Sequence, residues 1–341
     1  MTVPRARILD PRLALVLMAV FLALFPTVMR AIGGDVTLAS RILILGLFGL
    51  GVDLIFGFTG LLSFGQAAFY GTGGFVAGYL MIKNIVPNTL AALAVGTFAA
   101  TVAGFLVGAL SLRQVGVYFA MLTIAFGELF FFLENSPLRG FTGGESGLPG
   151  VPRATVPLGF TTLDFTSAFG TYTFIAVLYF LSYALMRRII ASPYGMVLRA
   201  ILENPARAAA VGHDVLRYKL TAFTIAAAYA GLAGGLLGVF QGYMPPEAFS
   251  IDQSGQIIVM TVIGGAGTLV GPLLGAFIWI FLQQALQNIG SIAGIWKLLL
   301  GLVFVLLVTG FRRGVAGGVL DVLTRRRSVA AAPPALSAED V

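Results

Sequence analysis

Several chemical groups are absent or scarce in this chain of 341 residues. It has no cysteine, which excludes disulfide bonds and thiolate metal ligands. Its single histidine, His213, has no cysteine or acidic companions, so it makes no metal site. The G-x-x-x-x-G-K-[ST] loop that holds nucleotide phosphates is also missing. We therefore expect no metal, no cofactor and no catalytic set.

Charged residues are scarce as well. They make up 10% of the chain, whereas 58% of it is apolar, and soluble domains carry about 25% charged residues. A soluble fold of this size cannot cover itself with so few charges. The apolar residues form separate runs, each near the roughly 20 residues that a helix needs to cross a bilayer. They lack the alternation of barrel strands. The sequence predicts an all-α, polytopic transmembrane helical bundle.

The apolar runs predict where the spans lie. They are near residues 13–31, 36–57, 60–82, 88–110, 115–135, 168–187, 219–241 and 294–311. A further stretch, 255–286, is long enough to cross twice or to re-enter, and its centre, GGAGTLVGP, has the glycines and proline that interrupt a helix. We expect eight to ten spans, including a broken or re-entrant helix pair.

The net charge of +7 follows a membrane pattern, not that of a nucleic-acid surface. With a cytoplasmic N-terminus, 15 of the 21 Lys and Arg residues fall on the inner side, as the positive-inside rule requires. This predicts a cytoplasmic N-terminus at 1–12, a membrane domain at 13–311 and a cytoplasmic, disordered tail at 312–341. The first span resembles a signal peptide but lacks a small-residue cleavage site, so we expect it to stay uncleaved.

Two spans carry stripes of small residues at helical spacing. In GLLSFGQAAFYGTGGFVAGYL the stripe contains Ser63 and Ala67, and a second stripe lies within 219–241. In lipid, close backbone approach across small residues supplies the association energy of helices. The glycines that we expect at these packing faces are Gly71, Gly74, Gly78, Gly231, Gly235 and Gly238.

Polar residues and helix-breaking glycines within the apolar runs are candidates for a translocation path or a gate, because polar groups in hydrocarbon are expensive. They are Asp53, Ser63, Gln66, Tyr70, Glu128, Gly264, Gly265 and Gly267. The polar residues near 63–70 either bond to other helices or line a water-filled path. Asp53 either reaches water at the inner end of its span or takes part in function. Glu128 either gates, holds helices together or contacts substrate.

The largest cytoplasmic insertion is the segment 191–218. It combines basic residues with apolar ones, which predicts a short amphipathic helix on the inner face. Such a helix either lies on anionic membrane lipid or docks onto a cytoplasmic partner. The stretch ENPARAAAVG favours docking.

Four ordered stretches resemble one known family. GLLSFGQAAFYGTGGFVAGYL, LTIAFGELFFFLENSPLRGFTGGESGLPGVP, LRAILENPARAAAVGHDVLRYKLTAF and VIGGAGTLVGPLLGAF are similar, in order and spacing, to the LivM-type permease of bacterial branched-chain amino acid ABC importers. The resemblance covers roughly residues 40–310. Three positions depart from the family: Asp53 stands where relatives usually carry Asn, Gln66 where many have His, and Ser146 where Asp or Asn is common.

The resemblance implies a non-enzymatic transport subunit of the inner membrane that moves branched-chain amino acids by alternating access. It implies a LivH-type partner permease, two cytoplasmic ABC ATPases that hydrolyse ATP, and an extracytoplasmic substrate-binding protein. The residues that it places at the ATPase contact are Arg199, Glu203, Asn204, Ala208 and Gly212.

Other functions stay open on the sequence alone. Urea and short-chain amide importers share the same motifs. An ion-coupled secondary transporter, with Asp53 or Glu128 as proton carrier, and a non-transporting scaffold are more distant alternatives.

Overall fold

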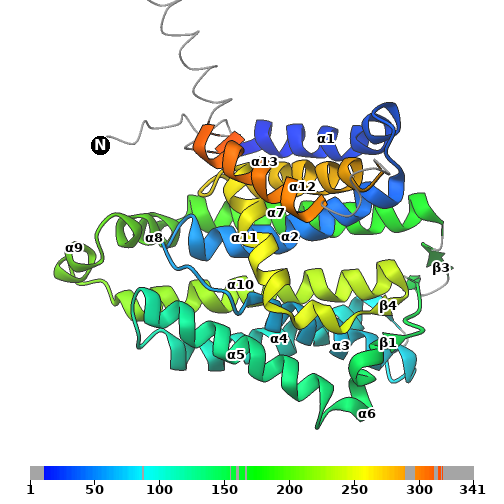
Figure 1. Cartoon of the computed structure of the whole chain (residues 1–341), viewed down its shortest axis with the longest axis horizontal. Coiled ribbons are helices and arrows are strands. Elements are labelled where there is room, and N and C mark those ends of the chain that lie inside the picture. Colours follow the sequence, from blue (N-terminus) through cyan, green and yellow to red (C-terminus); the bar gives the residue numbers. More distant parts are fainter. Residues whose placement is uncertain are drawn as a thin grey trace, which may run out of the picture.

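Long helices that run side by side make up most of this protein (Figure 1). The structure is a computed structural model that describes residues 11–86, 88–153, 155–158, 161–165, 167–288, 296–310, 314, 315 and 317. Within these residues six helices are long and apolar enough to cross a membrane. They are α1 (Pro11–Ala31), α2 (Val36–Phe56), α4 (Thr89–Ser111), α5 (Val117–Asn135), α7 (Ala168–Ala191) and α10 (Val215–Gln241). The chain is an all-α, multi-pass membrane protein. The first ten residues and, apart from 314, 315 and 317, the predicted tail at 312–341 lie outside the described ranges.

Four shorter helices lie among the long ones: α3 (Gln66–Ile82), α11 (Ile251–Gly264), α12 (Gly271–Asn288) and α13 (Trp296–Gly310). The short helices α8 (Pro193–Glu203) and α9 (Pro205–Ala210) project from one end of the bundle, on the left in Figure 1. We name this the α9 end. The opposite end, on the right, is named the α6 end.

The α6 end is built from short irregular elements. They are α6 (Arg139–Thr142), the 3-10 turns η1 (Gly144–Ser146) and η2 (Pro246–Phe249), and the strands β1 (Leu148–Pro149), β2 (Thr155–Leu158), β3 (Thr161–Asp164) and β4 (Tyr243–Met244). β1 pairs antiparallel with β4, and β2 with β3. The segment between α5 and β2 therefore contains α6, η1 and β1.

Two helices form the centre of the bundle. Within their apolar windows α2 is 89% buried and α10 is 72% buried, and α10 packs against α2, α3 and α4. A helix that is apolar all round belongs in such a core. α5, by contrast, is only 22% buried, and its exposed face includes Met121 and Phe132. Exposed apolar faces of this kind suit hydrocarbon or another subunit.

Helix starts coincide with capping residues. The side chain of Asn88 accepts a hydrogen bond from Leu90 N at 3.0 Å, and that of Ser167 accepts one from Gly170 N at 3.0 Å. Ser250 caps α11 in the same way through Gln253 N at 3.2 Å. Each cap satisfies a backbone donor that the first turn leaves free.

Glycines bring α3, α4 and α10 into backbone contact. A Cβ on Gly73 would lie 2.4 Å from the Cα of Gly231, and one on Gly234 would lie 1.8 Å from the carbonyl oxygen of Tyr70. No side chain fits at such separations, so these positions require glycine. Among the predicted packing positions, Gly231 meets Ala100 of α4 and Gly235 meets Leu93 of α4, while a Cβ on Gly238 would lie 3.8 Å from the sulfur of Met244. Gly71, Gly74 and Gly78 face Phe249, Met244 and Leu148.

One predicted helix break is confirmed, and two predicted helix starts change in the structure. The stretch 255–286 breaks within GGAGTLVGP, as predicted, into α11 and α12. The span predicted at 60–82 begins instead at Gln66, because residues 57–65 are not helical. Placing Ser63 on the helical stripe was therefore wrong. α10 begins at Val215 and not at 219, because Asp214 caps it through Arg217 N at 3.2 Å.

Candidate translocation site

The start of α3 lies inside the bundle and follows a segment that is not helical. Residues 57–65, here named the first interruption, join the end of α2 to Gln66. Its turn uses a left-handed backbone at Gly60, with φ of +75°, which glycine adopts without strain. Leu61 N donates to the carbonyl of Ile55 at 2.8 Å, so the segment first folds back on the end of α2.

Hydroxyl groups from two other helices satisfy the backbone at the start of α3. Phe64 N donates to Thr123 Oγ1 of α5 at 3.3 Å, and Ala67 N donates to Ser254 Oγ of α11 at 2.9 Å. Ser63 Oγ accepts from Gly65 N at 3.4 Å. Interrupted backbone at membrane depth needs such partners in the protein. The start of α3 is thus fixed between α5 and α11.

Gln66 is the most unusual side chain of this region. It is fully buried, and neither its amide nitrogen nor its amide oxygen has a hydrogen-bond partner among the described residues. Buried polar atoms normally have hydrogen-bond partners, so the unpaired carboxamide of Gln66 marks a candidate functional position. Transporters with discontinuous helices place polar solutes at such helix starts.

Ser63 and Tyr70, the other two residues predicted in this stretch, lie near Gln66 but make different contacts. Ser63 sits in the first interruption, and its hydroxyl serves the backbone. Tyr70 is buried one turn along α3 from Gln66, where its ring stacks on Phe48 of α2 with centroids 4.7 Å apart. The structure brings all three together around the start of α3, although they do not form one helical face.

Asp53 holds the second break in the bundle. Residues 265–270, here named the second interruption, separate α11 from α12. Asp53 Oδ1 accepts a hydrogen bond from Gly267 N at 2.7 Å, and its Oδ2 has no partner among the described residues. The side chain is 1% exposed. Asp53 therefore does not reach water, which was one of its two predicted roles.

The second interruption is tightly packed. Gly265 and Gly267 have φ of +116° and +77°, and a Cβ on Gly264 would lie 1.8 Å from the carbonyl oxygen of Gly271. Gly57 touches this region too, since a Cβ there would lie 2.2 Å from Gly267 N. The two interruptions thus meet at Gly57 and Gly267.

Glu128 lies outside this region. The structure places it on the exposed side of α5, whereas the buried residues of that helix are Phe119, Thr123, Gly127 and Glu134. Their spacing of four, four and seven positions follows one helix face. Glu134 is the acidic residue that sequence reasoning missed, because its place on the buried face of α5 is visible only in the structure.

The α9 end contacts the first interruption directly. The guanidinium of Arg199 on α8 lies 5.4 Å from the ring centroid of Phe58. Leu202, also on α8, lies so close to Gly60 that a Cβ there would be 2.9 Å from its Cδ1. α8 therefore rests on the segment that leads into α3.

The predicted amphipathic helix of this insertion is in fact two helices. Asn204 separates α8 from α9 and caps α9, because its side chain accepts a hydrogen bond from Arg207 N at 2.9 Å. Glu203, Asn204 and Gly212 are exposed, whereas Ala208 is buried. His213 lies directly before Asp214, the residue that caps α10.

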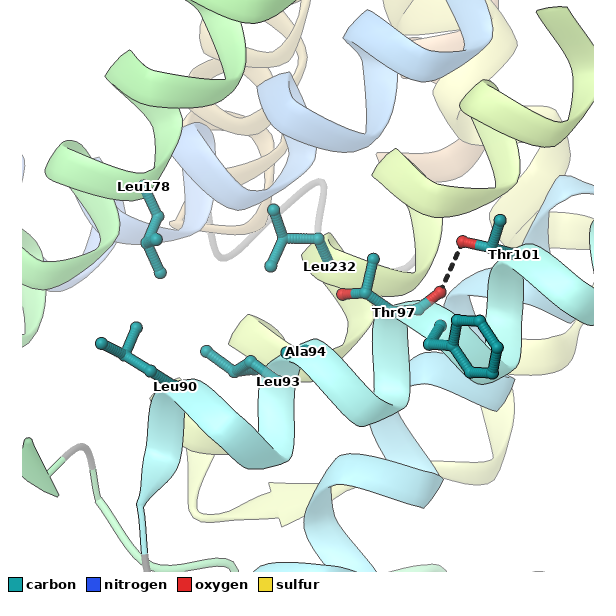
Figure 2. Close-up of a pocket in the computed structure, with 8 residues that line it drawn as sticks. Leu90, Leu93, Ala94, Thr97, Thr101, Leu178 and Leu232 are labelled. Carbon is teal, nitrogen blue, oxygen red and sulfur yellow. Dashed lines mark hydrogen bonds between the residues drawn. The ribbon is translucent and has the colours of Figure 1, made fainter. Parts of the chain in front are cut away.

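A cavity of about 470 Å³ opens between α4, α7 and α10. Figure 2 shows Leu90, Leu93 and Thr97 of α4 on one side and Leu178 and Leu232 on the others. The hydroxyl of Thr101 donates to the carbonyl oxygen of Thr97 at 2.7 Å. The described residues that line this cavity include no charged one, so they supply no group that selects a charged solute.

Comparison with known proteins places the chain in a family. Residues 36–308 match the family described as branched-chain amino acid transport system / permease component. The chain belongs to this family. It is a permease component, and therefore a transport subunit and not an enzyme.

Relatives named LivM match most of this chain, and a relative named LivH matches about a third of it. The high-affinity branched-chain amino acid transport system permease protein LivM of Escherichia coli is 29% identical over 297 residues, which cover 81% of this chain and 68% of that protein. The probable LivM of Methanocaldococcus jannaschii is 24% identical over 292 residues, 74% of this chain and 82% of that protein. The probable LivH of the same archaeon is 33% identical over 120 residues, 35% of each chain. No solved structure matches the chain significantly.

Proposed function

We propose that this chain is the permease subunit through which an ATP-driven importer moves branched-chain amino acids into the cell. The permease relatives are named for the transport of these amino acids. The chain itself has no nucleotide-binding loop, so separate partner subunits supply ATP hydrolysis. The match to a LivH supports a second, related permease as partner. An external binding protein delivers the substrate.

In this proposal the bundle crosses the inner membrane ten times, the upper value of the expected range. The six long helices cross singly, and α3, α11, α12 and α13 cross as shorter spans. Fourteen residues of α11 are too few for a bilayer of about 30 Å by themselves. The second interruption extends that crossing. With both termini in the cytoplasm, the α9 end faces inward, where the basic residues gather.

The main structural support for this proposal is the contact between α8 and the first interruption. α9 and the exposed residues beside it face the ATPase, while Arg199 and Leu202 of α8 touch Phe58 and Gly60. A movement of α8 therefore reaches the start of α3, where the buried Gln66 side chain has no hydrogen-bond partner within the described part of the chain. The glycine contacts of α3 with α10 allow the helices to slide, because no side chains interlock there.

A transport assay tests the proposal. Cells that lack the intact gene are expected to lose uptake of radiolabelled leucine, and uptake is expected to return with the complete chain. Lost urea uptake alongside unchanged leucine uptake would assign the chain to the urea or amide importers. Copurification with an ATPase is expected, whereas proton-driven uptake by the isolated chain in liposomes would contradict ATP coupling.

A further inference from the structure

The helix α5 leaves most of its surface uncovered, although it carries an acid near its middle. It lies at the lower edge of the bundle in Figure 1, on the side away from α1, and only 22% of its apolar window is buried. Glu128 is the twelfth of its 19 residues and is exposed. With a rise of about 1.5 Å per residue, its Cα lies roughly 10 Å from the nearer end of the helix. The carboxylate is therefore attached within the apolar part of the span.

Glu128 has no partner in the part of the chain that the structure describes. It makes no ion pair or hydrogen bond there, and the exposed residues one turn away on either side, Ala125 and Phe132, are apolar. A carboxylate that faces lipid is expensive, so acids within membrane spans normally face protein or water. Lipid is therefore an unfavourable cover for this face of α5.

The exposed residues around Glu128 have the spacing of a contact between two helices. Steps of three and four positions alternate along this stripe, here named the α5 seam, and all of its members are exposed: Tyr118, Met121, Ala125, Glu128 and Phe132. Alternating steps of this kind keep side chains on one line, along which a second helix interlocks. The α5 seam combines large apolar side chains, one small residue and one carboxylate, which together suit a partner helix.

The exposed face of α4 has a different chemistry. It includes Phe105, Leu106 and Leu110, and α4 contains no ionisable residue. Such a face suits hydrocarbon without any further protein. The two exposed faces therefore differ in the group that needs a protein partner, which is Glu128.

A second copy of this chain fits the α5 seam badly. Two copies in one membrane have the same orientation, so a two-fold contact through the seam places both Glu128 side chains at the same depth. Like charges close together destabilise such a contact. A different subunit can place a basic or amide side chain at that depth instead. The second, related permease of the proposed function, which the match to a LivH supports, is a subunit of this kind.

We propose that the α5 seam binds a transmembrane helix of the second permease, and that Glu128 accepts hydrogen bonds from a basic or amide side chain of that helix. The inference rests on the proposed function, which supplies the second permease, and it adds the surface and the contact. Met121 and Phe132 flank Glu128 on the seam and exclude lipid from the polar pair. Helices in membranes associate through such packing together with interhelical hydrogen bonds.

A photo-cross-linking experiment tests the surface in membranes that contain the complete chain and its partner subunits. Benzoylphenylalanine replaces Met121 or Phe132 in separate variants, and irradiation is expected to join each variant to the second permease. The control has the same group in place of Leu106 of α4. Leu106 lies five positions before the end of α4, and Met121 lies four positions after the start of α5, so the two probes are matched in depth. The control is expected to give no adduct with the second permease.

Substitution of Glu128 tests the polar contact. Glu128→Leu leaves the donor of the second permease without its acceptor, and is expected to lower the amount of that subunit retained on the purified chain about tenfold or more. Glu128→Gln keeps an acceptor oxygen and is expected to restore part of the binding. Glu145→Leu changes an exposed acid outside α5 and is expected to retain the second permease like the wild type. Because Glu128 is exposed in this chain, its variants are expected to keep the thermal transition of the isolated subunit.

Four results would overturn the inference. They are adducts between two differently tagged copies of this chain, α5 probes that react with lipid alone, adducts with the second permease from position 106 only, and full retention of the second permease by Glu128→Leu. Leucine uptake separates these results from a failure of the proposed function. If the gene deletion abolishes uptake and a second permease copurifies, but the adducts come only from α4, the transporter stands and the α5 seam falls. Unchanged uptake after the deletion would instead overturn the proposed function.

Discussion

The two interruptions of this bundle meet at Gly57 and Gly267, yet they are held in opposite ways. The second interruption is fixed from within: Asp53 accepts its backbone N–H, and Gly264 leaves no room for a side chain. The first interruption is held at its α3 side by hydroxyls of Thr123 and Ser254 and at its other side by α8. The side chains of Arg199 and Leu202 of α8 contact the first interruption.

Because they are held differently, the two interruptions are expected to differ in how far they move. A break whose backbone N–H is bound by a buried carboxylate acts as an anchor, because displacement leaves both groups without their hydrogen-bond partner. A break that rests on an amphipathic helix and on single hydroxyl bonds can move at lower cost. We expect the second interruption to stay in place while the first shifts with α8.

The largest effect on stability is expected from adding a side chain at the tightly packed second interruption. Gly264→Ala places a methyl group 1.8 Å from the carbonyl oxygen of Gly271, so the backbone must separate. We expect a loss of about 3 kcal/mol or more in stability, measured as the thermal transition of the detergent-purified protein. Gly255→Ala in the same helix meets no atom within 4 Å, and is expected to leave the transition unchanged or raise it slightly. Similar transitions for both variants would refute the packing of α11 on α12.

Asp53→Ala removes the acceptor of Gly267 N and is expected to cost about 1 to 3 kcal/mol. Asp53→Asn keeps an oxygen at the same place, so its stability and leucine uptake are expected to stay near the wild-type values. This pair of variants also separates anchoring from proton transfer, because an amide cannot carry the proton. Abolished uptake by a stable Asp53→Asn protein would contradict the anchor.

Ser254→Ala removes the acceptor of Ala67 N at the start of α3. One neutral hydrogen bond is lost, so the expected cost is about 1 kcal/mol, less than for Asp53→Ala. Ser254→Thr retains the hydroxyl and serves as the control. A larger loss of thermal stability in Ser254→Ala than in Asp53→Ala would reverse the comparison between the two interruptions.

Arg199→Ala is expected to change stability least, by about 0.5 to 1 kcal/mol, because a cation over a ring at an exposed site contributes little. It is nevertheless expected to lower leucine uptake while the amount of protein in the membrane stays constant. Arg188→Ala, an exposed arginine at the end of α7, is the control. Equal uptake by both variants would remove Arg199 from the transmission path.

The sequence predicts one interruption and misses the other for a physical reason. GGAGTLVGP contains the residues that break a helix, so the second interruption is visible locally. Residues 57–65 are apolar enough to continue a helix, and the partners that stabilise their irregular backbone, Thr123 and Ser254, lie far away in the chain. Asp53 is visible as an acid in an apolar run, but its partner Gly267 is 214 positions away.

The candidate site residues also divide into those that the sequence identifies and those that only the structure identifies. Gln66 and Tyr70 stand out as polar residues among small ones, and both are buried at the start of α3. Glu128 and Glu134 are separated by less than two turns of α5. Hydropathy alone favours Glu128 as the functional acid, because it lies deeper in the apolar run. Burial depends on the helix face and on α6, whose Thr142 bonds back to the carbonyl of Glu134, and neither is visible without tertiary structure.

The link between α8 and the first interruption is tested most directly by locking it. The chain has no cysteine, so Gly60→Cys together with Leu202→Cys places the only two thiols on either side of this contact. A short bifunctional methanethiosulfonate is expected to join them and to stop leucine uptake, and a reductant is expected to restore it. Each single variant, treated in the same way, is the control. Full uptake by the cross-linked double variant would contradict the claim that α8 moves the start of α3.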